Sequence, residues 1–341
     1  MSDIIKVGII GGAGYTGGEL LRLIINHPHI SVAFVHSNSN GGKPVHAVHA
    51  DLFGDTDLYF TNDSNFESLF KEAGSAADFS DCALFLCVGH GDAKSFLEEN
   101  NIPQQVRIID LSQDFRLKGN SHWLTNSFVY GLPELNKAEI QNSKYIANPG
   151  CFATCIQLAL LPLAKAGKLN NSIQINATTG STGAGQSLSK TSHFSWRNNN
   201  LSAYKIFTHQ HLLEIGESLS RLQPNRHPEI NFIPQRGDFP RGIFASVYLN
   251  CDLSLEEANE LYISYYESAP FTHVSLQNID LKQVINTNKC LLYLEKHDDK
   301  LVIFSIIDNL LKGASGQALQ NFNLMFGFPE KTGLSLKSIG F

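Results

Sequence analysis

Short apolar runs alternate with amphipathic segments over the first 150 residues. Residues 4–10 form an almost continuous apolar run, which is typical of a strand covered on both faces of its sheet. Residues 17–25 follow with leucines and isoleucines that supply the buried side of a helix. Strands that alternate with helices in this way predict a doubly wound parallel sheet. The further elements predicted here are strands at 31–36, 83–88 and 106–111 and a helix at 92–99.

The pattern changes after residue 150. A helix rich in Leu and Ala is predicted at 151–166, and the strands beyond it are separated by long stretches with few helices. This order predicts an α+β domain with a mixed sheet. A last helix begins near residue 314 and ends at Gly327, with Pro329 beyond it, as helix ends usually do. The strands predicted in this part are 172–177, 229–234, 242–250, 290–295 and 301–307, the last two forming a hairpin.

Composition narrows the possible functions. The 341 residues are enough for two domains of ordinary size. The formal net charge of −6 leaves no broad basic surface, so we expect no nucleic-acid partner. No apolar run reaches the ~18 residues of a spanning helix, and no leader pattern precedes the first strand, so we expect a cytoplasmic protein with no membrane partner. The six cysteines form no C-x-x-C pair, which predicts reduced thiols and no metal site.

A glycine-rich loop stands between the first strand and the first helix. Gly11, Gly14 and Gly17 are evenly spaced, with Tyr15 and Thr16 between the last two. Glycine lets the backbone approach a pyrophosphate, and the helix N-terminus offers unpaired N–H groups and a positive dipole end. The spacing departs from the plain G-x-G-x-x-G pattern. Its strand–loop–helix context nevertheless favours a Rossmann dinucleotide site over a tight turn that binds nothing.

The end of the second strand bears on the choice between NAD and NADP. An Asp or Glu there would hydrogen-bond the ribose hydroxyls of NAD. Residues 36–43 contain no acid, whereas Ser37 and Lys43 offer a hydroxyl and a cation. These groups could hold a 2′-phosphate, so the pattern favours NADP.

Cys151 follows a Pro-Gly turn at the head of an apolar helix. A cysteine at a helix N-terminus gains thiolate stabilisation from the dipole and the free N–H groups, and the thiolate is the nucleophile. We therefore predict a catalytic role for Cys151, although a buried structural thiol is the commoner case for cysteine. Cys155, one turn later, is expected in the core, where it could also trap an oxidised Cys151 as a disulfide.

Two histidines, His209 and His211, stand two residues apart. In an extended segment both would face the same side, whereas at a helix start they would diverge. The pair could serve catalysis, bind a metal or lie on the surface. Because no third ligand has a suitable spacing, we favour catalysis and expect no metal.

Further polar groups extend the candidate site. A second glycine-rich loop includes Gly180, Thr182 and Gly183, and its backbone could approach a nicotinamide or an acyl oxygen, or form a simple turn. Arg116 and Arg241 lie close to predicted strand ends. Guanidinium groups suit phosphate and carboxylate, although most arginines are solvated surface charges.

Taken together, these motifs resemble those of the N-acyl-glutamyl-phosphate reductases of arginine biosynthesis, in the semialdehyde dehydrogenase superfamily. The resemblance runs nearly end to end. Its most specific parts are the cysteine motif at 148–151 and the segment His209-Gln210-His211-x-x-Glu214-Ile215. The other matching segments are residues 11–20, 110–116, 130–134, 180–185, 239–242 and 308–314.

The resemblance implies roles for individual residues. Cys151 would be the acylated nucleophile and His209 the acid/base. Arg241 would bind a substrate anion, and Asn309 would lie near the cofactor. The remaining candidates are His211 and Arg116 for the substrate and Ser112 for the cofactor.

Two positions depart from the family pattern. Gln186 follows the second glycine-rich loop, where a basic residue is common, and Lys190 is the nearest cation. Asn38 lies in the region after the second strand where an arginine is common. The first departure leaves one anion contact unassigned, and the second weakens the case for NADP.

The predicted reaction is NADPH-dependent reduction of N-acetyl-L-glutamyl 5-phosphate to the 5-semialdehyde through a Cys151 thioester, which accepts hydride more readily than a carboxylate. We expect an NADP-binding domain at 1–150, joined by the C-terminal helix at about 314–341. Residues 151–313 would form the catalytic, substrate and oligomerisation domain. Apolar strands in its sheet favour a homo-oligomer, either a dimer or a tetramer.

Several alternatives stay open at this point. The N-acyl group could be succinyl, and the substrate could be an aspartyl or aminoadipyl phosphate in the same class of reaction. A non-catalytic dinucleotide-binding protein and a cofactor-free cysteine hydrolase are the alternatives from other classes. The first glycine-rich loop argues against the hydrolase.

Overall fold

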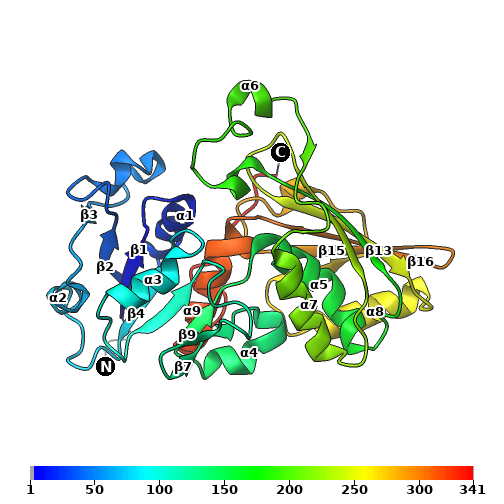
Figure 1. Cartoon of the computed structure of the whole chain (residues 1–341), viewed down its shortest axis with the longest axis horizontal. Helices are drawn as coiled ribbons and strands as arrows, with labels where there is room; N and C mark the ends of the chain where they lie inside the picture. Colours follow the sequence, from blue (N-terminus) through cyan, green and yellow to red (C-terminus); the bar gives the residue numbers. More distant parts are fainter. Residues whose placement is uncertain (1–3, 341) are drawn as a thin grey trace. The chain divides into compact units, whose positions relative to one another are not determined.

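The computed structural model describes residues 4–340 and divides the chain into two units (Figure 1). The first unit runs to Pro149 and resumes over Ala314–Ser335. The second comprises Gly150–Gly313 and the residues from Leu336 onward. Each unit is built on its own seven-stranded sheet.

The sheet of the first unit is parallel throughout, in the order β3-β2-β1-β4-β5-β9-β8. All five residues of the central strand β4 are buried, as expected for a strand covered on both faces. The predicted doubly wound parallel sheet is confirmed. Its strands are β1 Ile5–Ile10, β2 Ile30–His36, β3 Phe60–Thr61, β4 Cys82–Leu86, β5 Arg107–Asp110, β8 Val129–Tyr130 and β9 Tyr145–Ala147.

The helices of the first unit include one from the C-terminal part of the chain. Helix α9 packs against α1, α4 and β5. Its Asn321 is fully buried and donates hydrogen bonds to the Gly131 carbonyl and to Asn148 Oδ1, so it fixes the segment that leads to residue 150. The helices are α1 Tyr15–Ile24, α2 Phe66–Glu72, α3 Asp92–Glu99, α4 Pro133–Gln141 and α9 Gly316–Met325, with a π-helical turn over Leu311–Ser315 before α9.

The sheet of the second unit is mixed, in the order β11-β12-β10-β13-β16-β15-β14. Strands β10 and β12 are parallel, whereas β13, β16 and β15 follow as antiparallel neighbours. The predicted mixed sheet and the β15–β16 hairpin are therefore confirmed. The strands are β10 Ile173–Thr179, β11 Ser202–Ala203, β12 Ile230–Arg236, β13 Ile243–Asn250, β14 Thr272–Ser275, β15 Cys290–His297 and β16 Lys300–Ile307.

Three long helices accompany this sheet, although only the first was predicted as a helix. Helix α5 contacts β13 and β16, α8 contacts β14 and β15, and α7 packs against α5. Buried and half-buried side chains alternate along β10 and β13, as expected when one face of a sheet is covered by helices. The helices of this unit are α5 Cys151–Lys165, α6 Phe194–Arg197, α7 His211–Leu222 and α8 Leu255–Tyr266.

One predicted loop tip differs only at its first residue, since Asn198 and Asn199 are exposed and lie outside α6. The run from Arg197 to Asn200 resembles a flexible loop tip in the sequence, but Arg197 ends α6 and is 8% exposed. Its guanidinium donates to the carbonyls of Arg236 and Gly237, and these bonds fix the segment. No helix within residues 4–340 is long and apolar enough to cross a membrane.

Candidate active site

The first turn of α5 presents Cys151. Gly150 is the N-cap residue and supplies no side chain to the free N–H groups of the helix. Cys151 is the first helical residue and is partly exposed, whereas Cys155 is buried. The predicted position of Cys151 at a helix N-terminus is confirmed, and this position stabilises a thiolate.

Cys155 belongs to the core of the second unit. Its thiol donates to the Ser305 carbonyl and to Ser305 Oγ, at 3.3 Å and 3.4 Å. Burial raises the pKa of Cys155 well above its usual value, so this thiol stays protonated at neutral pH.

Gly313 lies in close contact with Cys151. A Cβ on Gly313 would lie 2.8 Å from Cys151 Cβ, which is closer than side chains pack. The Gly313 N–H donates to the Asp308 carbonyl at 2.9 Å. The chain that follows β16 can therefore approach Cys151 only because residue 313 lacks a side chain.

The two histidines meet at the start of α7. His209 precedes the helix, and its Nδ1 accepts a hydrogen bond from the backbone N–H of His211, the first helical residue. The two ring centroids are 4.6 Å apart, and the Phe152 ring lies 5.4 Å from that of His209. Of the two arrangements that the sequence left open, the rings lie together rather than apart, because His209 precedes the helix and folds back over its first turn.

His209 is neutral at physiological pH. Its pKa is lowered to about 4, mainly by burial and also by Lys205, while Glu214 acts in the opposite direction. A neutral imidazole is the form that can accept a proton.

Glu214 connects the histidines to the nucleophile's turn. The side chain is 4% exposed, and its Oε2 accepts a hydrogen bond from the Gly150 N–H at 3.0 Å. Its Oε1 lies 3.9 Å from His211 Nε2. Glu214 belongs to the motif at 209–215, but the sequence does not predict it as a site residue, because spacing alone does not show that α7 packs on α5.

Tyr204 is a second residue of this site that the sequence did not reveal. Its ring centroid lies 5.8 Å from that of His209. Burial raises the pKa of Tyr204 to about 12, Cys151 adds to the shift, and Arg236 opposes it. The phenol therefore stays protonated and can donate a hydrogen bond. A tyrosine in an irregular segment carries no sequence signal for such a position.

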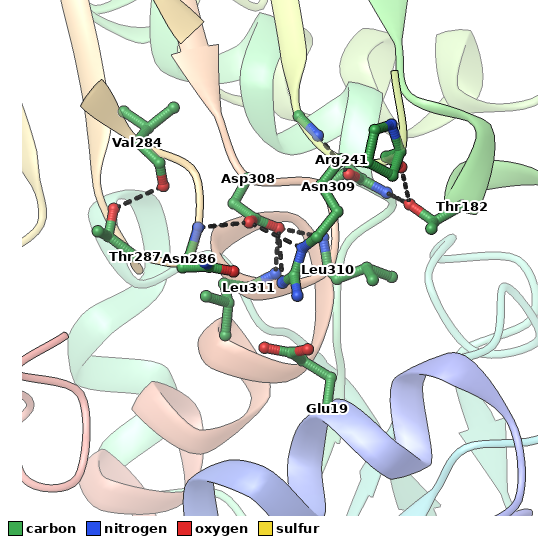
Figure 2. A network of polar contacts seen from close by, with 12 residues as sticks. Glu19, Thr182, Arg241, Val284, Asn286, Thr287, Asp308, Asn309, Leu310 and Leu311 are labelled. Atoms are coloured by element: carbon green, nitrogen blue, oxygen red, sulfur yellow. Dashed lines mark hydrogen bonds and ion pairs between the residues drawn. The ribbon is translucent and has the colours of Figure 1, made fainter. Parts of the chain in front are cut away.

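Asp308 organises a polar network at the end of β16 (Figure 2). The carboxylate is fully buried and accepts hydrogen bonds from Arg241 Nε and Nη2, both at 3.1 Å. It also accepts from the backbone N–H groups of Asn286, Leu310 and Leu311. This bidentate pairing fixes the plane of the Arg241 guanidinium.

The second glycine-rich loop joins this network through Asn309. Asn309 Nδ2 donates to Thr182 Oγ1 at 3.0 Å, and its Oδ1 accepts from the Gly242 N–H at 2.6 Å. A Cβ on Gly180 would lie 2.5 Å from the Pro240 carbonyl oxygen, so only glycine fits there. The structure thus brings together the predicted residues Gly180, Thr182, Gly183, Arg241 and Asn309.

The first unit carries the predicted cofactor loop after β1. Gly11 has φ +73°, and a Cβ there would lie 2.5 Å from the Cys87 carbonyl oxygen. A Cβ on Gly17 would lie 2.7 Å from the Gly12 backbone. Helix α1 begins with Gly14 as N-cap, without a side-chain cap or an acid in its first turn. An uncapped N-terminus approached closely by backbone fits a phosphate group.

The other candidates of the first unit lie at the same edge of the sheet. Ser37 follows β2, Lys43 Nζ donates to Asn40 Oδ1, and Ser112 Oγ donates to the buried Asp110. Arg116 is buried, and its Nε and Nη2 donate to the carbonyls of Asn148 and Leu111, both at 2.9 Å.

Comparison with known proteins identifies the family. The chain matches the models of the semialdehyde dehydrogenase NAD binding domain over residues 6–143 and of the dimerisation domain over residues 151–309. N-acetyl-gamma-glutamyl-phosphate reductase of Phocaeicola vulgatus is 55% identical over 99% of this chain and 100% of its own length. The Flavobacterium johnsoniae relative of the same name is 56% identical over the same shares. This chain belongs to the N-acetyl-gamma-glutamyl-phosphate reductase family.

The family and superfamily predicted from the motifs are thereby confirmed. Solved structures give the same fold: aspartate semialdehyde dehydrogenase II of Vibrio cholerae aligns with TM-score 0.69 and 16% identity, over 94% of this chain and 98% of that one. The Candida albicans enzyme, solved with NADP, aligns with TM-score 0.65 and 13% identity over the same shares. At such identities the likeness shows the fold alone. A nicotinamide dinucleotide is the cofactor class that the NAD binding domain indicates.

Proposed function

We propose that this member of the reductase family converts N-acetyl-L-glutamyl 5-phosphate to the 5-semialdehyde and phosphate through a thioester on Cys151. The observation that carries this proposal is the partly exposed thiol at the uncapped start of α5, with a neutral His209 against the ring of Phe152, the next residue, and the buried Glu214 on the Gly150 N–H. A thiolate is a strong nucleophile toward an acyl phosphate. The reaction is a step of arginine biosynthesis.

The first step forms one bond and breaks one bond at the acyl carbon. The Cys151 sulfur attacks that carbon, and the C–O bond to phosphate breaks with its electron pair. His209 accepts the thiol proton. Accepting it at Nε2 requires the tautomer protonated on Nδ1, so the 3.2 Å contact with the His211 N–H must be given up when substrate binds.

The second step reduces the thioester. A bound nicotinamide supplies the hydride for this reduction. The protonated His209 donates to the developing alkoxide and takes that proton back as the C–S bond breaks, so that the aldehyde leaves and the thiolate is restored. Tyr204, protonated and next to His209, can stabilise the oxyanion by a hydrogen bond.

The cofactor that we propose is NADPH. The glycine-rich loop and the start of α1 would hold the pyrophosphate, with Gly11, Gly14, Tyr15, Thr16 and Gly17. Ser37 and Lys43 would hold the 2′-phosphate, since no acid follows β2 before residue 44. Ser112, Gly180, Thr182, Gly183 and Asn309 are the further cofactor contacts that we propose.

Substrate anions would be held by arginine. Arg241, with its plane fixed by Asp308, is the proposed ligand of the phosphoryl group. The observed contacts of Arg116 suggest that it also shapes the Asn148 turn that leads to Cys151, and His211 completes the proposed substrate site.

We also propose that the chain forms a homodimer, or a tetramer of two dimers, in the cytoplasm. Helices α5 and α8 pack on one face of the mixed sheet. Half-buried side chains of β13 and β16, among them Tyr248, Val302 and Phe304, point to the opposite face. The six free thiols suit a reducing compartment.

The proposed function is tested in the reverse direction. Wild-type protein should oxidise N-acetyl-L-glutamate 5-semialdehyde only when inorganic phosphate is present, and faster with NADP than with NAD. Cys151→Ser should bind NADPH normally but lose at least 10³-fold in rate. Oxidation without phosphate, or full activity of the serine variant, would refute the proposal.

A further inference from the structure

Two arginines of the second unit lie together beside the candidate site. Arg236 is the last residue of β12, and Arg197 Nη1 donates to its carbonyl at 2.8 Å. Within residues 4–340, neither guanidinium forms an ion pair with a carboxylate. Asp238 is the acid that acts on Arg197, and its Oδ2 accepts a hydrogen bond from the Asn199 N–H.

One guanidinium nitrogen of the pair also lacks a hydrogen-bond partner in the described part of the chain. Arg236 Nε is buried and has no hydrogen-bond partner among the described residues. Arg197 is 8% exposed, and burial lowers its pKa, with the charge on Arg236 lowering it further. Two neighbouring cations in a half-buried place are unfavourable unless an anion binds there.

A chain of rings leads from Arg236 to the nucleophile. The Arg236 guanidinium lies 4.7 Å from the Tyr204 ring centroid, and the pairing of β11 with β12 fixes this position. Tyr204 is next to His209, which in turn lies beside Phe152, the residue after Cys151. Tyr204 therefore contacts both Arg236 and His209, and its pKa is also raised by Cys151.

We propose that Arg236, supported by Arg197, binds a carboxylate of the substrate remote from the acyl phosphate. The proposal rests on the proposed function, because that function supplies the substrate. When the acyl carbon of the substrate is at Cys151, a substrate group that extends past Tyr204 to Arg236 must come from the end of the substrate opposite the acyl phosphate. A planar guanidinium fork suits a carboxylate there. Arg236 would supply the anion contact that Gln186 leaves unassigned.

Two carboxylates of the substrate class could occupy this place. One is the α-carboxylate, which every N-acylglutamyl phosphate carries. The other is the terminal carboxylate of an N-succinyl group, which an N-acetyl substrate lacks. A substitution of Arg236 distinguishes these two carboxylates, because the α-carboxylate is present in both the N-acetyl and the N-succinyl substrate, whereas the terminal carboxylate is present only in the N-succinyl substrate.

The test compares wild type, Arg236→Gln and the matched control Arg226→Gln, a surface arginine of the same unit. Each is assayed in the phosphate-dependent oxidation of N-acetyl- and N-succinyl-glutamate 5-semialdehyde. For Arg236→Gln we expect the KM for the semialdehyde to rise at least 10-fold, with kcat and the KM for the nicotinamide within about 3-fold of wild type. Arg226→Gln should match wild type.

The KM values for the two semialdehydes show which carboxylate Arg236 binds, or that it binds neither. A rise for both substrates assigns the α-carboxylate, and a rise for the succinyl substrate alone assigns its terminal carboxylate. Unchanged KM for both, or an equal fall in kcat and cofactor affinity, would overturn the proposal. Wild type inactive on both semialdehydes would instead overturn the proposed function, and this inference with it. If Arg236→Gln does not fold, Arg236→Lys, which keeps the charge without the fork, must still raise KM at least 3-fold.

Discussion

At the residue scale, the proposed chemistry depends on the side chains near Cys151 and on what each of them does. Glu214 is the residue whose role the structure changes most. It is buried, it accepts a hydrogen bond from the Gly150 N–H, and it raises the pKa of His209 against burial. We therefore regard it as a positioning residue that fixes the turn before the nucleophile.

Glu214→Gln should keep the volume and the Gly150 contact but lose the charge. We expect kcat to fall 10- to 100-fold while the KM for the nicotinamide stays unchanged. The acidic limb of the kcat/KM profile should move to lower pH, because the His209 pKa loses its raising contribution. Steady-state kinetics from pH 4 to 8 measure both effects. Glu260→Gln, on the exposed surface of α8, is the control; an unshifted limb in Glu214→Gln would contradict this role.

The lowered pKa of His209 also predicts how stability depends on pH. Between about pH 6.5 and 4 the unfolded chain binds a proton at this residue that the folded protein does not bind. Wild type should therefore lose stability as pH falls through this window, by up to about 1.4 kcal/mol per pH unit from this group. His209→Asn should lose correspondingly less. Denaturant titrations at pH 7, 6 and 5 test this, and parallel losses in the two proteins would count against a buried neutral His209.

Sequence patterns located some residues of the site and missed others for a physical reason. The position of Cys151 could be predicted because a Pro-Gly turn before an apolar helix is a local signal. Tyr204 and Arg236 could not be predicted, because only the pairing of β11 with β12 brings them together.

At the element scale, two close approaches by glycine shape the candidate site. Gly17 lets α1 begin directly on the Gly12 backbone, and Gly313 lets the chain after β16 pass Cys151. Both are steric requirements, because a Cβ at either position would lie under 3 Å from its neighbour.

Gly17→Ala should therefore displace the cofactor loop. We expect the KM for the nicotinamide to rise at least 10-fold, since the phosphate-facing N–H groups would move, while the unit stays folded. Gly216→Ala is the matched control: Gly216 is also helical, but no atom lies within 4 Å of its added Cβ. That variant should keep its KM and be slightly more stable. Equal KM values in the two variants would contradict the cofactor role of the loop.

Elements were predicted well where the hydrophobic period was strong. The strands β1, β4, β13 and β16 were found within about two residues of their ends. Helix α7 was not predicted, because it begins with His211 directly after a polar segment and its apolar stripe is short. The short strands β8, β9 and β11 were missed because two or three residues carry no period.

At the scale of the whole molecule, the proposed dimer explains the second face of the mixed sheet. Val302 lies on β16 between Tyr248 and Glu295, and its neighbour Ile303 is fully buried on the opposite side. Half-buried apolar side chains on such a face are suited to a second copy.

Val302→Asp should place a charge on that face and convert the oligomer to monomers in sedimentation velocity at micromolar concentration. Ile263→Asp is the control, since Ile263 is 48% exposed on α8. That variant should keep the wild-type sedimentation coefficient. An unchanged oligomer in the Val302 variant would place the interface elsewhere.

The sequence predicts the approximate boundary between the two units, but not the contacts that join α9 to the first unit. The change from alternating strands and helices to widely spaced strands marks a boundary near residue 150. The return of α9 to the first unit depends on buried amides such as Asn321, whose partners lie far away in the sequence. No local pattern predicts those contacts.

The proposed mechanism requires that Cys151 becomes acylated by the substrate. The most direct measurement mixes the protein with N-acetyl-L-glutamyl 5-phosphate in the absence of nicotinamide, quenches in acid, and identifies the modified peptide by mass spectrometry. We expect an N-acetylglutamyl adduct on Cys151 and a burst of about one phosphate per active chain, and neither in Cys151→Ser. Phosphate release with no adduct on Cys151, or an adduct on another residue in the wild type, would contradict it.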